Sequence, residues 1–86
     1  LLYLHVDVDI LDVGLVPNHP TGEPNGPDLA QTLAAIETVL ATGKVAAFAL
    51  VSVRADGEGG AVSLRSGTEL LAGSMAAWRR HGALAG

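Results

Sequence analysis

The stretch YLHVDVDILD, residues 3–12, decides how the rest of this sequence is interpreted. It starts as a run of bulky residues that is apolar on both faces and then becomes acidic, as a buried parallel strand does where it meets a polar loop. In parallel α/β sheets, ligands gather at the carboxyl ends of the strands, and Asp7 and Asp9 fall at such an end. The sequence therefore predicts a strand over residues 2–8 with a binding site at its end.

The segments that follow alternate between loop, helix and strand. All four prolines lie between residues 14 and 27, which predicts a long loop. An apolar stripe at steps of four, three and four residues predicts a helix over 28–42, with Asp28 in its first turn and Gly43 as its stop. A second apolar run predicts a strand over 44–53.

The last third of the chain predicts a polar connection over 54–60 and then a final helix. We expect this helix to be capped by Ser66 or Thr68 and to end at Gly82. Its expected buried side chains are Leu71, Met75 and Trp78. Strands that alternate with helices predict an α/β fold with a parallel sheet.

Asp7 and Asp9 carry the chemistry that this pattern suggests. Side chains two residues apart on a strand point to the same side, so the two carboxylates should converge. Two carboxylates held together repel each other, and a divalent cation or a shared proton relieves that repulsion. Carboxylate oxygens suit magnesium and manganese, which activate water for hydrolysis. Asp-x-Asp alone also fits magnesium-dependent phosphatases, glycosyltransferases and a solvated strand end.

Composition narrows the classes of protein that are possible. The 86 residues are 49% hydrophobic, and their mean hydropathy of +0.38 is high for a small domain, which predicts a fragment or a chain that needs a partner. A net charge of −4 with 5 Lys and Arg residues gives no basic surface for nucleic acid or an anionic membrane. The absence of cysteine suits the cytoplasm, and the longest apolar run, 45–51, is too short to span a bilayer.

Residues 3–12, Pro17, the 26–29 segment GPDL and the 41–45 segment ATGKV together resemble the arginase, agmatinase and formiminoglutamase family, the ureohydrolases. The resemblance implies an arginase-like three-layer α/β/α fold with a parallel sheet. Residues 1–86 would be the C-terminal fragment of that single domain, supplying about two strands and two helices. It also implies a cytoplasmic homo-oligomer.

The resemblance further implies a function and a set of metal ligands. Asp7 would bridge two manganese ions, and Asp9 would bind one of them. The activity would be hydrolysis of a linear C–N bond in a small amidine or guanidine substrate. The other ligands belong to earlier family motifs that these residues lack, so the remainder of the fold, from an earlier segment or a companion chain, is an expected partner.

Two positions depart from the family pattern and put arginine in doubt as the substrate. The second strand of typical members carries an Asp and a substrate-binding Glu, and here Ala49 and Ser52 replace them. A hydroxyl offers a guanidinium no bidentate, charge-assisted partner. We therefore expect Ser52 to contact a substrate other than plain arginine, with Glu23 of the loop as a possible replacement carboxylate.

Four further residues receive roles from their positions. His5 lies two residues before Asp7 and is expected to hold a ligand carboxylate in place. Asp12 is expected to fix the loop through backbone hydrogen bonds. His19 and His81 are expected on the surface of a loop and of a helix end.

Two other interpretations remain open from the sequence alone. The chain could be a non-catalytic family member that has lost substrate recognition at Ala49 and Ser52. It could also belong to an unrelated magnesium-dependent α/β enzyme that uses Asp-x-Asp.

Overall fold

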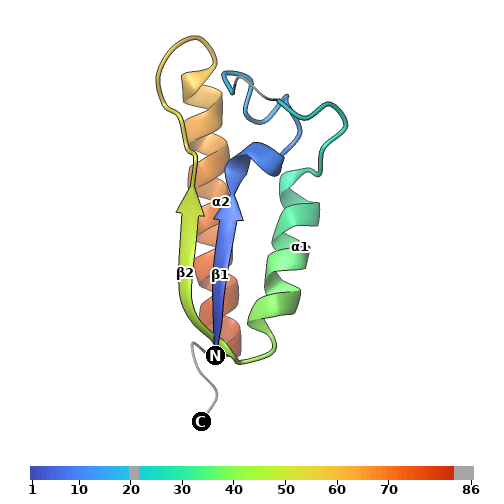
Figure 1. The fold of residues 1–86 in the computed structure, drawn as a ribbon, viewed down its shortest axis with the longest axis vertical. Coiled ribbons are helices and arrows are strands. Elements are labelled where there is room, and N and C mark those ends of the chain that lie inside the picture. Colours follow the sequence, from blue (N-terminus) through green and yellow to red (C-terminus); the bar gives the residue numbers. More distant parts are fainter. Residues whose placement is uncertain (20–21, 83–86) are drawn as a thin grey trace.

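The structure is a computed structural model, which describes residues 1–19 and 22–82. It is an α/β arrangement in which two parallel strands lie side by side and two helices cover them (Figure 1). In chain order, its elements are β1 (Leu2–Asp7), the 3-10 turn η1 (Val8–Ile10), α1 (Leu29–Leu40), β2 (Val45–Val51) and α2 (Gly60–His81). The predicted α/β class, the parallel pairing and the crossover helix are therefore confirmed.

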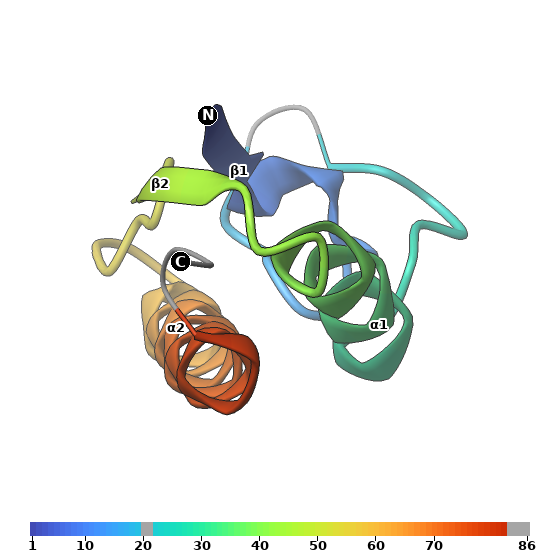
Figure 2. The ribbon, with the colours of Figure 1, turned by 90° about the horizontal axis from the view of Figure 1, so that it is seen from below.

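Both helices lie on the same face of the strands (Figure 2). Val6 of β1 and Val45 of β2 point into the core formed there, against Ile36 and Leu40 of α1 and Leu70 of α2. The described residues thus supply the sheet and one helical layer of the expected three-layer fold.

The other face of the sheet has no covering element among the residues that the structure describes. On β1, the side chain of Tyr3 is 64% exposed and packs edge-on against His5, with 6.0 Å between the ring centroids. The pairing aligns Tyr3 with Ala47 and His5 with Ala49, so small apolar residues continue this open face onto β2. A parallel sheet is normally covered on both faces, so this surface is available to a second layer.

The sequence of α1 fixes both of its ends. Asp28 is the N-cap residue: its side chain accepts a hydrogen bond from the Gln31 N–H at 2.7 Å, and the Gln31 side chain accepts one from the Asp28 N–H at 2.9 Å. This reciprocal pair is a capping box. Beyond the helix, Gly43 adopts a φ of 71°, a conformation that a residue without a Cβ reaches without strain. The helix predicted over 28–42 is therefore correct to within its capping residues.

The predicted start of α2 is wrong. The helix begins at Gly60, and Ser66 and Thr68 lie within it rather than capping it. Ser66 is buried and donates a hydrogen bond to the Leu15 carbonyl at 2.6 Å. Tertiary packing explains the error, because the buried face of α2 is made largely of small residues that resemble a loop in sequence: Gly60, Ser63, Ser66, Gly67, Leu70, Ser74 and Ala77.

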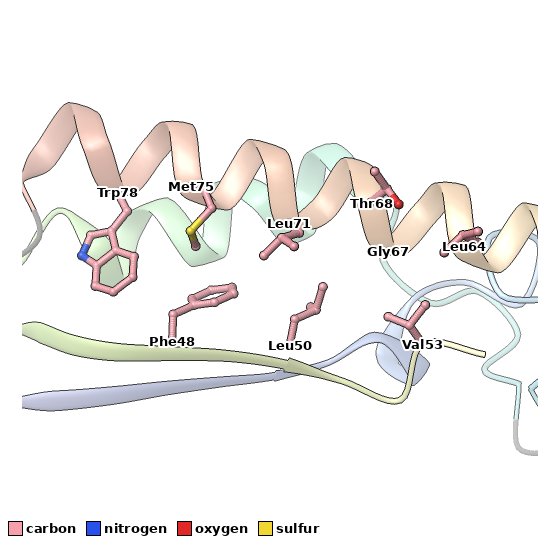
Figure 3. A pocket seen from close by; sticks show the side chains of 9 residues that line it. All are labelled: Phe48, Leu50, Val53, Leu64, Gly67, Thr68, Leu71, Met75 and Trp78. Atoms are coloured by element: carbon pink, nitrogen blue, oxygen red, sulfur yellow. The ribbon is translucent and has the colours of Figure 1, made fainter. Parts of the chain in front are cut away.

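The predicted buried face of α2 is also displaced. Leu71 is 42% exposed, and Met75 and Trp78 are half-buried. These larger side chains line an open groove of about 410 Å³ between α2 and β2, opposite Phe48 and Leu50 (Figure 3). The three side chains predicted from the sequence therefore share one face of α2, but this face lines the groove, and of the three only Trp78 also packs against the core.

The long loop between β1 and α1 is closed at its base by backbone hydrogen bonds. The Asp12 N–H donates to the Pro27 carbonyl at 3.0 Å, and the Val13 N–H donates to the Glu23 carbonyl at 3.0 Å. Val16 is buried in the core. The loop therefore leaves and re-enters the fold at the carboxyl end of β1, where the candidate site lies. No described helix is long and apolar enough to cross a membrane.

Candidate metal centre at the carboxyl end of β1

Asp7 and Asp9 are brought together by a tight turn. Asp7 is the last residue of β1 and the N-cap of η1, and its Oδ1 accepts a hydrogen bond from the Asp9 N–H at 3.2 Å. The strand ends at Asp7, one residue earlier than predicted, so the alternation of side chains along a strand does not account for their approach. The 3-10 turn folds the chain back and places the second acid beside the first.

The two carboxyl groups shift each other's protonation. The hydrogen bond with the Asp7 side chain, followed by burial and the charge of Asp7, raises the pKa of Asp9; Glu23 adds to this rise and His19 opposes it. Burial also acts to raise the pKa of Asp7, but hydrogen bonds from the Asp9 backbone, from Ser52 and from the Asp9 side chain outweigh it, and the pKa of Asp7 is lowered. The pair therefore holds concentrated negative charge, with Asp7 as its more acidic member.

Ser52 stands next to Asp7 across the sheet. It follows Val51, the residue of β2 that pairs with Asp7, and its φ of 70° is unusual for a residue other than glycine. Its side chain lies near enough to the Asp7 carboxylate to contribute to the lowered pKa of Asp7. Ser52 is thus a neighbour of the candidate ligand.

The other candidate residues, Asp12, Glu23 and His5, lie in different surroundings. Asp12 accepts a hydrogen bond from the Gly14 N–H at 2.9 Å, so it fixes the loop as expected from the sequence. Glu23 is exposed and lies near enough to Asp9 to raise its pKa. His5 is exposed on the open face of the sheet, where its ring meets Tyr3.

His19 is the neighbour that the sequence did not reveal. It was expected on the loop surface, yet its side chain is 13% exposed and its Nε2 lies 3.8 Å from Oδ2 of Asp9. Ten residues separate the two in sequence, and no periodic pattern within a proline-rich loop predicts such an approach. The sequence signal that could have indicated this contact is a histidine in the loop that follows the acidic end of a strand.

These donors do not complete a metal site. Among the residues that the structure describes, no three His, Asp or Glu side chains are placed to hold one ion together. The groove between α2 and β2 is lined by none of the acidic residues. The candidate centre is therefore a pair of adjacent carboxylates, with Ser52 and His19 beside them, that needs further ligands.

Taken together, parallel strands joined by a helix, with paired acids at the carboxyl end of the first strand, define an α/β protein with its candidate site where such folds bind ligands. No protein-family model matches the chain. The sequence is 35% identical over 63 residues to an agmatinase from Pyrococcus horikoshii, a match that covers 73% of this chain and 22% of that protein.

This similarity supports a relationship to the arginase family, in line with the resemblance seen in the sequence. The matched part of the chain spans about a fifth of the length of that relative. An arginase-like fold is consistent with the parallel strands and crossover helix.

Proposed function

We propose that this chain contributes the Asp7–Asp9 part of the active site of a manganese-dependent hydrolase that cleaves linear C–N bonds in amidines or guanidines. The observation that carries the proposal is the pairing of these two carboxylates at the end of β1, in a chain similar to an agmatinase. A cytoplasmic homo-oligomer remains part of the proposal.

The two carboxylates have the chemistry that such a metal pair requires. Adjacent carboxylates, of which Asp7 raises the pKa of Asp9, are stabilised by a divalent cation, and carboxylate oxygens are ligands that manganese prefers. When bound, the ions would lower the pKa of water and so supply a nucleophile for hydrolysis. The residues of this chain would bind and orient the ions. By the resemblance to the family, Asp7 would bridge the two ions and Asp9 would bind one of them.

The remaining ligands must come from outside these residues, because no described cluster of three donors is present. The proposed partner is therefore the remainder of an arginase-like fold. The open face of the sheet around Tyr3 and His5 is the surface that a second helical layer would cover.

Substitution of Asp7 tests the proposal. In the full-length protein that contains this segment, Asp7→Asn removes a bridging anion and should abolish binding of the metal pair, measured as manganese per subunit by elemental analysis. Asp12→Asn is the matched control: it changes a carboxylate of the same loop that bonds the Gly14 N–H, so it should cost stability and leave the metal content unchanged.

The outcomes separate the alternatives. Unchanged manganese after Asp7→Asn would show that the ligand assignment is wrong. Metal binding that depends on Asp7, without turnover of any amidine or guanidine, would identify a non-catalytic member of the family.

A further inference from the structure

The approach of His19 to Asp9 is not explained by the proposed ligand set. Its Nε2 lies 3.8 Å from Oδ2 of Asp9, and the imidazole is largely buried while the carboxylate is 31% exposed. An ion pair between exposed side chains contributes little to the stability of a protein, and its side chains are held loosely. A buried imidazole aimed at one oxygen of a candidate ligand differs from that case.

The backbone before His19 is anchored firmly. The Asn18 side-chain amide donates to the Arg54 carbonyl at 2.9 Å and to the Asp56 carbonyl at 2.8 Å, and its oxygen accepts a hydrogen bond from buried Ser63. The His19 N–H donates to the Val16 carbonyl at 3.1 Å. These contacts tie the loop to the β2–α2 connection and to α2, so the position of His19 is set by the fold.

The imidazole of His19 could be a metal ligand or could hold a ligand in place, and the geometry favours the second role. Among the described residues, His19, Asp7 and Asp9 are not placed around one point as three ligands of an ion would be, which favours a role for His19 beside the ligands. Its Nε2 faces Oδ2 of Asp9, so the imidazole lies against one oxygen of the candidate ligand. A contact of 3.8 Å is longer than a hydrogen bond, but contacts at functional sites often shorten when the ligand binds.

We infer that His19 is a positioning residue, which donates from Nε2 to Oδ2 of Asp9 and holds that carboxylate in the orientation that binds the metal. This inference rests on the proposed function. Groups that hold ligand side chains in place typically change metal affinity by about 10–100-fold when they are removed. His5, the histidine expected from the sequence in this role, lies on the open face of the sheet with its ring edge-on to Tyr3.

Two substitutions of similar bulk test the inference in the full-length protein. His19→Met fills the space but has no N–H to donate, and His19→Gln keeps a donor. Titration with manganese alone, followed by calorimetry and by electron paramagnetic resonance of the bound ion, should show affinity lowered about 10–100-fold for His19→Met and largely restored for His19→Gln. His81→Met, at the exposed end of α2, is the control and should bind as the unchanged protein does.

Equal affinities for both variants, whether unchanged or equally weakened, would overturn the role of the donated hydrogen bond. Asp7→Asn distinguishes this failure from failure of the proposed function. If Asp7→Asn loses the metal while His19→Met binds normally, only the inference about His19 fails; if Asp7→Asn binds normally, the metal centre itself is misassigned.

Discussion

Ser52 shows how a single residue alters the chemistry expected at the end of a strand. It lies beside Asp7 and helps to lower the pKa of that carboxyl, at a position where the resemblance implies a substrate-binding carboxylate. The sequence identified the substitution, but not the contact, because pairing of Asp7 with Val51 is what brings Ser52 beside the acid. By contrast, the contact of Asp12 with the Gly14 N–H is local in sequence and was predictable. His19 was not, since its position depends on Asn18 bonding to residues far along the chain.

On the proposed function, Ser52 predicts a substrate preference. A serine hydroxyl offers no charge to a guanidinium, so on the proposed function the full-length protein should hydrolyse arginine poorly. Loss of a charge-assisted hydrogen bond costs about 1.5–3 kcal/mol, which is at least a tenfold loss in kcat/KM. Steady-state assays with arginine, agmatine, guanidinobutyrate and formiminoglutamate measure this preference. Efficient arginine hydrolysis that survives Glu23→Ala would show that neither Ser52 nor its proposed substitute limits the substrate.

At the scale of elements, local signals predicted α1 well and α2 poorly. The cap at Asp28, the apolar stripe and Gly43 all lie within or beside α1 in sequence. The first turns of α2 carry glycine and serine, which favour loops in isolation. They are helical here because small side chains let α2 pack closely: a Cβ on Gly67 would lie 2.8 Å from a Val53 methyl group. Packing of this kind cannot be read from local propensity.

Two buried serines on α2 give a matched test of that packing. Ser66 donates to the Leu15 carbonyl, whereas the hydroxyl of Ser74, which is 0% exposed, has no hydrogen-bond partner among the described residues. A buried, unpaired hydroxyl costs about 1–3 kcal/mol, so Ser74→Ala should raise the free energy of unfolding by about 1 kcal/mol. Ser66→Ala should lower it by about 0.5–1.5 kcal/mol. Chemical denaturation of the full-length variants measures both, and shifts of the same sign would contradict this account.

At the scale of the whole molecule, apolar surface remains open on both sides of the sheet. The groove of about 410 Å³ flanks β2, and a second groove of about 250 Å³, lined by Leu4, Ile36 and their neighbours, flanks β1. The exposed face carrying Tyr3 adds to them. The high apolar content of the sequence predicted that this chain does not bury all of its hydrophobic residues by itself. The sequence did not predict where the exposed apolar surfaces lie, because their positions depend on how the helices pack on the strands.

Residues 1–86 alone should therefore not fold as a stable monomer. A two-stranded sheet with uncovered edges and a small core is marginal in water. Thermal unfolding followed by circular dichroism, with light scattering to determine the molecular mass, should show a broad transition or self-association. A sharp, cooperative transition of a monomeric species would contradict the expectation.

The parallel pairing also has a kinetic consequence. Leu2 pairs with Val45, roughly 40 positions further along the chain, so the intervening segment must close into a loop before the sheet gains any hydrogen bond. Helix α1, with its capping box, is built from contacts between near neighbours and can form early. Contacts between distant residues slow folding. Pairing of β1 with β2 is therefore a late event. The turn that joins Asp7 and Asp9 is local in sequence and can form before it, whereas Ser52 reaches Asp7 only at that step.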